Sequence, residues 1–193
     1  MKTLASCRCG ALAGLALAAG LAGCATDIAP QDHTIAPSPV PLASFESFVL
    51  RPLAVEHMQG DSADHAALQQ IEIELRGCVR AALRGLREEP EVNGAGGRTL
   101  VVAPVVVDLK KVNRTERRWV GPFAGSSAVL LRLELRDAAA QAPVAAPVFH
   151  ASGDAWRGSF APFAASDDAM LQEVVDEACG YVTDNLGVRV AAP

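Results

Sequence analysis

The side chains best placed to do chemistry are the five cysteines, since a thiol can be acylated, oxidised to a disulfide or bound to a metal. They are Cys7, Cys9, Cys24, Cys78 and Cys179. Cys24 stands directly after Ala22 and Gly23, at the end of an uncharged run of Ala, Leu and Gly. Small residues at these two positions would let a peptidase reach the backbone. Cleavage there would leave Cys24 as the first residue of the mature chain, with its thiol available for a lipid.

The first 23 residues have the parts of an export signal. Lys2 and Arg8 form a short positive region, and the apolar run Gly10–Gly23 is shorter than the ~20 residues of a membrane span. The run ends in Leu21-Ala22-Gly23-Cys24, which resembles the lipobox of bacterial lipoproteins. The resemblance implies that Cys24 carries fatty acyl chains such as palmitate, and that Ala25, in place of Asp, favours the outer membrane. An ordinary cleaved signal and an uncleaved anchor are the alternatives.

Removal of the signal would make the chain more acidic. It takes away Lys2 and Arg8, which leaves 15 basic against 22 acidic residues and a net charge of −7. An acidic chain disfavours nucleic-acid binding, which needs a basic surface. No segment after Cys24 is long and apolar enough to span a membrane, so we expect the lipid bilayer to be reached through acylated Cys24.

Other residues that could do chemistry have simpler explanations. Gly60-Asp61-Ser62 resembles the nucleophile block of GDSL-type hydrolases, but those enzymes also need a His near the carboxyl end. The last His here is His150, inside a predicted strand, and a helix cap explains Asp61 and Ser62 better. The four His residues are scattered, with no Cys or His at metal-ligand spacing. We therefore predict no catalytic residue, no metal and no cofactor.

The rest of the chain predicts a tether followed by one domain. Residues 24–43 contain four prolines and no apolar period, as in an extended tether. Residues 44–189 predict strands over 45–55, 99–109, 128–136 and 148–156, and helices over 65–86 and 166–186. The order β-α-β-β-β-α predicts an α+β fold, a two-layer sandwich in which a four-stranded mixed sheet has both helices on one face. Its first two strands are parallel neighbours, and the next two are antiparallel.

Two of the predicted strands have hydrophobic patterns that indicate where they lie in the sheet. The strand over 128–136 places Leu131, Leu133 and Leu135 on one face and charged residues at 132, 134 and 136 on the other. This alternation is typical of a half-exposed antiparallel strand. The strand over 99–109 is apolar on both faces, as in the centre of a sheet, and Pro104 predicts a bulge in it.

Cys78 and Cys179 are predicted to form a disulfide. Each lies on one of the two predicted helices, which should lie side by side on one face of the sheet. Export would place both residues in an oxidising compartment, where disulfides form and persist. The alternative is two separately buried thiols, which behave as small apolar residues.

The stretch Arg117-Arg118-Trp119-Val120-Gly121-Pro122-Phe123-Ala124-Gly125-Ser126-Ser127 leads directly into the strand over 128–136. Together with Leu135-Arg136-Asp137-Ala138, it resembles the Gly-rich hairpin of small bacterial lipoprotein families known as domains of unknown function. It departs from their pattern where Pro122-Phe123 replaces a glycine. The resemblance implies a periplasmic α/β domain that docks onto other envelope proteins, and it brings no catalytic residues.

The topology predicts a partner-binding surface where loops 110–123 and 156–163 meet at one end of the sheet. Its candidate residues are Trp119, Phe123, Trp156, Phe160, Phe163, Arg117 and Arg118. Aromatic residues with arginine are typical of interface hot spots. The alternative is that the aromatic side chains close the end of the core. The tether is expected to enter at the opposite end, at the start of the first strand.

These features predict a lipid-anchored protein of the outer membrane whose non-enzymatic periplasmic domain binds another envelope component. A small-ligand or glycan-binding domain and an enzyme are the two alternatives. A pocket lined by convergent polar groups would favour a ligand, whereas an exposed apolar end without such a pocket would favour a protein partner.

Overall fold

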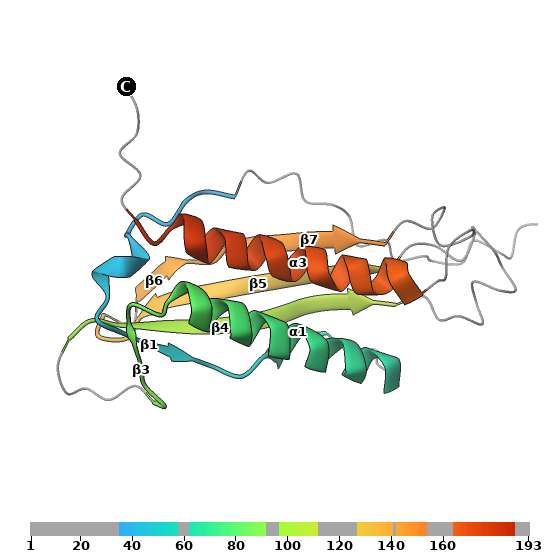
Figure 1. Cartoon of the computed structure of the whole chain (residues 1–193), viewed down its shortest axis with the longest axis horizontal. Coiled ribbons are helices and arrows are strands. Elements are labelled where there is room, and N and C mark those ends of the chain that lie inside the picture. The colour runs from blue at the N-terminus through green and yellow to red at the C-terminus, as the bar shows by residue number, and fades with distance from the viewer. Residues whose placement is uncertain are drawn as a thin grey trace, which may run out of the picture.

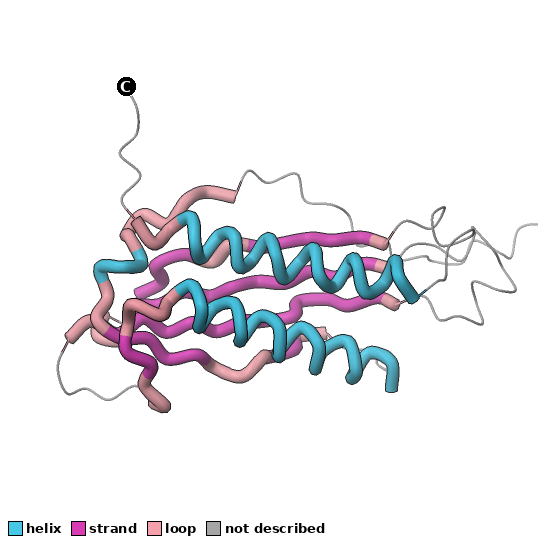
Figure 2. Tube along the Cα trace, in the orientation of Figure 1, coloured by secondary structure: helices cyan, strands magenta, loops and turns pink. Residues whose placement is uncertain are grey.

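The computed structural model describes residues 35–57, 62–91, 97–111, 127–140, 142–153 and 164–187. Within these ranges, two long helices lie on one face of a seven-stranded mixed sheet, as Figure 1 and Figure 2 show. The predicted α+β class is confirmed, but the predicted four-stranded sheet is wrong, because the sheet has seven strands. No helix in the described part of the chain has the length and apolar character needed to cross a membrane.

The central strands have the predicted order and direction. The helices are α1 (Ser62–Ala82) and α3 (Ala164–Asp184), and the strands are β1 (Ser47–Leu50), β2 (Ala54–Val55), β3 (Arg87–Glu88), β4 (Thr99–Lys110), β5 (Ala128–Asp137), β6 (Ala142–Ala145) and β7 (Val148–Ser152). Strands β1 and β4 are parallel neighbours, and β5 is antiparallel to β4 and to β7. Strands β3 and β6 complete the sheet at its two edges, beside β1 and β5.

The three additional strands are all short. The predicted strand over 45–55 is divided into β1 and β2, with Pro52 between them, and both parts pair with β4. Strand β3 has two residues, too few for a hydrophobic period. Strand β6 contains Ala and Pro143, which are uncommon in strands, so its sequence gives little β signal.

Pro104 lies in the centre of the sheet without the predicted bulge. It pairs in register with Leu133 of β5, and the irregularity in β4 falls later, between Val106 and Asp108. The N–H of Leu133 is donated to the Pro147 carbonyl at 3.0 Å, away from β4, so Pro104 and Leu133 form a non-hydrogen-bonded pair. The missing N–H of Pro104 therefore faces the break between β1 and β2, where no ladder bond is lost.

The core lies between the helices and the sheet. Leu131, Leu133 and Leu135 of β5 are fully buried in this core, which confirms the predicted apolar face of the strand. The helices contribute side chains at helical spacing, among them Ile71, Leu75, Val79, Leu171, Val174, Ala178 and Val182. On the other face of β5, Arg132 and Arg136 each form an ion pair with Glu134 between them.

The domain begins earlier than the predicted boundary at residue 44. Ile35–Ala43, which we call the arm, lies along the domain, and its Leu42 is fully buried in the core. The arm runs back along the C-terminal part of α3 from the start of β1 (Figure 1), and Ile35 at its far end shares a hollow with Glu177 and Tyr181. The predictions that residues up to 43 form a free tether, and that this tether joins the domain at the start of the first strand, are therefore corrected. An apolar Leu between prolines carries no periodic signal.

Candidate functional site

The predicted partner-binding residues lie outside the described part of the chain. These are Trp119, Phe123, Trp156, Phe160, Phe163, Arg117 and Arg118, and the lipidation candidate Cys24 lies outside it too. The residues that flank their loops do meet at one end of the sheet, because Lys110 pairs with Ala128, and Ala128 with Ser152. The topology that brings the two loops to one end is as predicted, while the placement of the aromatic side chains stays a prediction.

The two remaining cysteines join the helices. Cys78 of α1 and Cys179 of α3 form a disulfide with their Cα atoms 5.9 Å apart, within the usual range for a disulfide. Both side chains are partly buried at the edge of the core. The bond closes a long loop, since 101 positions separate the two residues in sequence.

The arm is fastened to the end of α3 by specific hydrogen bonds. Asn185 is buried, and its side-chain oxygen accepts the Ser38 N–H at 2.7 Å, while its carbonyl accepts the Leu42 N–H at 2.8 Å. Its amide group also donates to the Tyr181 carbonyl at 2.7 Å, which caps the last turn of the helix. The Tyr181 hydroxyl donates to the Ala36 carbonyl at 3.3 Å. Sequence analysis missed this role of Tyr181 and Asn185; the only signal was an Asn at a helix end.

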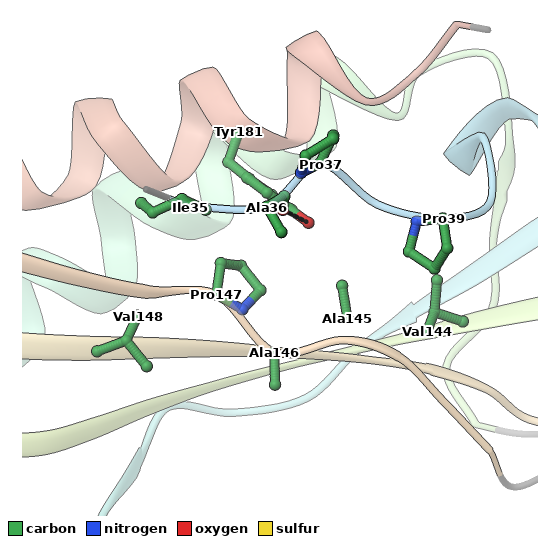
Figure 3. Close-up of a pocket in the computed structure, with 10 residues that line it drawn as sticks. All are labelled: Ile35, Ala36, Pro37, Pro39, Val144, Ala145, Ala146, Pro147, Val148 and Tyr181. Carbon is green, nitrogen blue, oxygen red and sulfur yellow. Dashed lines mark hydrogen bonds between the residues drawn. The ribbon is translucent and has the colours of Figure 1, made fainter. Parts of the chain in front are cut away.

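A groove lies between the arm, the C-terminal half of α3 and the β6–β7 edge of the sheet, and it contains two adjoining hollows. The first, which we call the apolar hollow, has a volume of about 380 Å³. Figure 3 shows it between the arm and the β6–β7 connection, with Tyr181 reaching in from α3 and Pro147 opposite. Its lining is Ile35, Ala36, Pro37, Pro39, Val144, Ala145, Ala146, Pro147, Val148 and Tyr181. Among the described residues, the Tyr181 hydroxyl is the only polar side-chain group in this lining.

The second hollow has carboxylates as well as apolar residues in its lining, and we call it the acidic hollow. Its volume is about 360 Å³, and Glu177 and Asp184 of α3 line it beside Phe149 and Tyr181. The two rings meet edge to face, with their centroids 6.0 Å apart. Both hollows share Ile35, Pro37 and Tyr181 in their linings, so they adjoin each other.

The charged side chains of α3 and its C-terminal end are all negative. The segment 164–187 contains six Asp and Glu residues and no Lys, Arg or His. Burial, together with the neighbouring Glu173 carboxylate, raises the pKa of Glu177, although His150 acts in the opposite direction. Burial also raises the pKa of the Tyr181 hydroxyl. The acidic hollow is therefore a place where a cation would be favoured and a second anion would not.

A separate charged cluster holds the base of the arm. The Arg98 guanidinium donates to one oxygen of Asp137 from Nε at 3.1 Å and from Nη2 at 2.9 Å, and lies 4.5 Å from the ring centre of Phe45. The other oxygen of Asp137 accepts the Ala139 N–H at 3.0 Å. The Arg98 hydrogen bonds lower the pKa of Asp137; burial opposes this shift, and backbone N–H groups add to it.

Asp137→Asn is expected to flatten the acid limb of the stability curve. Because the folded-state pKa of Asp137 is lowered, the ionised carboxylate stabilises the fold above the ordinary Asp pKa of about 3.9, and this contribution is lost as pH falls through the lowered value. Urea unfolding of both proteins from pH 7 to pH 2 measures the difference. The matched control is Glu91→Gln, which removes an exposed carboxylate. Parallel acid limbs for the wild type and Asp137→Asn would contradict the assignment.

The catalytic pattern considered from the sequence lies only partly within the described residues. Asp61 lies outside the described residues, Ser62 is the first residue of α1, and His150 lies on the separate strand β7. Among the residues that the structure describes, no three His, Cys, Asp or Glu side chains are grouped as metal ligands.

By sequence, the chain matches no protein-family model. It also matches no curated protein. By structure, it is similar to a subunit of the PelC dodecamer from Paraburkholderia phytofirmans, with a TM-score of 0.50 and 14% identity over 77% of this chain and 94% of that one. At this identity the likeness shows the fold alone.

Two further structures are similar in outline. A Xanthomonas campestris protein of the DUF330 family has a TM-score of 0.43 and 16% identity, over 79% of this chain and 90% of that one. A candidate lipoprotein from Caulobacter crescentus CB15 has a TM-score of 0.34 and 15% identity, over 69% of this chain and 86% of that one. At these scores the likenesses are too loose to define even the fold.

Proposed function

We propose that the protein is an outer-membrane lipoprotein, acylated at Cys24, whose non-enzymatic periplasmic domain binds another component of the envelope. The fastening of the arm carries this proposal. Only residues 25–34 separate Cys24 from Ile35, so the anchor can stand at most ~35–40 Å from the docked arm. A domain held this close to a membrane meets envelope components before any others.

The surface proposed for the partner is the end of the sheet where the loops after β4 and β7 begin. Their sequences contain five of the chain's aromatic residues, and arginines at 114, 117, 118 and 157, on an otherwise acidic protein. Large aromatic residues with arginine supply most of the binding energy in many interfaces. A second copy of the chain is one such partner, since the similarly folded PelC forms a dodecamer.

Trp119→Ala and Phe160→Ala are expected to abolish partner capture by crosslinking in intact cells, with little change in melting temperature. The loss follows if these rings are anchors of the interface rather than parts of the core. Ile73→Ala is the matched control, because Ile73 is an apolar residue of α1 that is 71% exposed. A captured product of twice the chain's mass would identify a second copy as the partner. Unfolding of the two variants, or undiminished capture, would contradict the proposed surface.

A small-ligand or glycan-binding domain is the second candidate, and the groove is the observation that favours it. The hollows beside the arm, of about 380 and 360 Å³, are at the small end of the ~300–1,000 Å³ typical of ligand sites. The acidic hollow also has two carboxylates in its lining, although ligand sites usually add several convergent polar groups.

A further inference from the structure

We propose that the groove beside the arm is a second docking surface, and that it takes a basic, extended peptide segment of an envelope protein. An apolar side chain of the segment enters the apolar hollow, and a neighbouring Lys or Arg reaches the acidic hollow. This inference does not depend on the surface proposed for Trp119 and Phe160, which lies at the end of the sheet.

The apolar hollow favours an apolar side chain over a polar one. In the lining that the structure describes, Tyr181 supplies the only polar side-chain group, and its hydroxyl already donates to the Ala36 carbonyl. A polar group buried there would lose its bonds to water with little to replace them. An aliphatic side chain would instead be removed from water against the prolines of the arm and the apolar residues of the β6–β7 connection.

The acidic hollow favours a cation as its neighbour. Glu177 and Asp184 line it, and the whole segment 164–187 contributes six acidic residues and no basic one, while His150 of β7 adds a weaker opposing influence on Glu177. Ile35, Pro37 and Tyr181 form the boundary between the hollows, so the methylene stem of a Lys or Arg has apolar surface to follow. Complementary charge of this kind selects the partner and speeds its association.

The segment docks mainly through its side chains rather than as an added strand. Within the described residues, no strand pairs with the outer side of β6 or β7, so this edge is open. Pro143 and Pro147, however, interrupt the row of N–H donors along it, and proline at an edge discourages strand addition. The specificity of binding therefore comes from the two hollows.

Binding can be measured with the mature protein in nanodiscs of zwitterionic lipid, with empty nanodiscs as the blank. The probe is a fluorescent pentapeptide in which lysine alternates with leucine. Two comparison peptides test the chemistry: in one, glutamate replaces lysine, and in the other, serine replaces leucine. We expect saturable binding of the lysine–leucine peptide, weakened by salt, and at least tenfold weaker binding of each of the other two.

Two variants of the groove test where the peptide binds. Ala145→Trp, at a residue whose side chain points into the apolar hollow (Figure 3), is expected to weaken binding at least tenfold, whereas Ala139→Trp, at an exposed turn, leaves it unchanged. Glu177→Gln removes one carboxylate and is expected to weaken binding by about two- to fivefold, whereas Asp168→Asn, at the far end of α3, does not.

No binding of the lysine–leucine peptide, equal binding of the glutamate peptide, or an unchanged affinity in both groove variants would overturn the inference. If Ala145→Trp lowers the melting temperature, the Glu177→Gln result decides alone. These outcomes are independent of partner capture at Trp119 and Phe160, so the failure of one proposal is distinguishable from the failure of the other.

Discussion

Replacing both Cys78 and Cys179 with alanine is expected to lower the free energy of unfolding by about 2–5 kcal/mol, the usual cost of removing a native disulfide. The two residues are 101 positions apart, so the bond restricts a large part of the unfolded chain. In the chain-entropy model a loop of this length contributes up to ~4.7 kcal/mol, and real bonds often contribute less. Urea unfolding of the oxidised wild type and the double variant measures the difference.

Reduction provides the control for this prediction. A reductant should lower the unfolding midpoint of the wild type toward that of the double variant, and it should leave the double variant unchanged. Thiol titration of denatured, unreduced protein should find neither Cys78 nor Cys179 free. Two titratable thiols, or equal stability of the oxidised wild type and the double variant, would show that the helices are not covalently joined.

The parts of the fold that follow from the sequence are those with long periodic patterns. The alternation in β5 and the apolar spacing of α1 and α3 extend over several turns or pairs, so their burial can be predicted before the structure is known. The strands β3 and β6 are too short to show such a pattern. They form because they pair with β1 and β5, and their own residues do not predict them. Strand pairing of this kind is a tertiary property.

The proline positions show a second limit of sequence analysis. Pro104 is typical of a strand edge or a bulge, yet it lies in the central strand because its missing N–H faces the break between β1 and β2. The prolines of the arm are typical of a free tether, yet Asn185 and Tyr181 fix the arm to α3. In both cases, a residue distant in the sequence decides the outcome.

The two candidate sites differ in how far the sequence predicts them. The end of the sheet where the two loops begin follows from strand order alone, and the residues that flank these loops lie there. The groove could not be predicted, since it needs the arm, α3 and the β6–β7 edge to meet. One property of the groove does follow from the sequence, because α3 has six acidic residues and no basic one.

Lipidation of Cys24 is expected to be an all-or-none effect. Acylation needs the thiol, so Cys24→Ser should accumulate as an unprocessed or soluble form, while the wild type fractionates with the outer membrane. Several acyl chains, at ~0.8 kcal/mol per buried methylene, make this attachment effectively permanent. Cys9→Ser is the matched control, because Cys9 lies within the predicted signal and should be dispensable for processing.

The most direct test of membrane anchoring is growth with labelled fatty acid, followed by mass spectrometry of the mature amino terminus. We expect the wild type and Cys9→Ser to take up label and to begin at an acylated Cys24, and Cys24→Ser to take up none. A wild-type protein that takes up no lipid label, or that begins at a residue other than Cys24, would contradict the account.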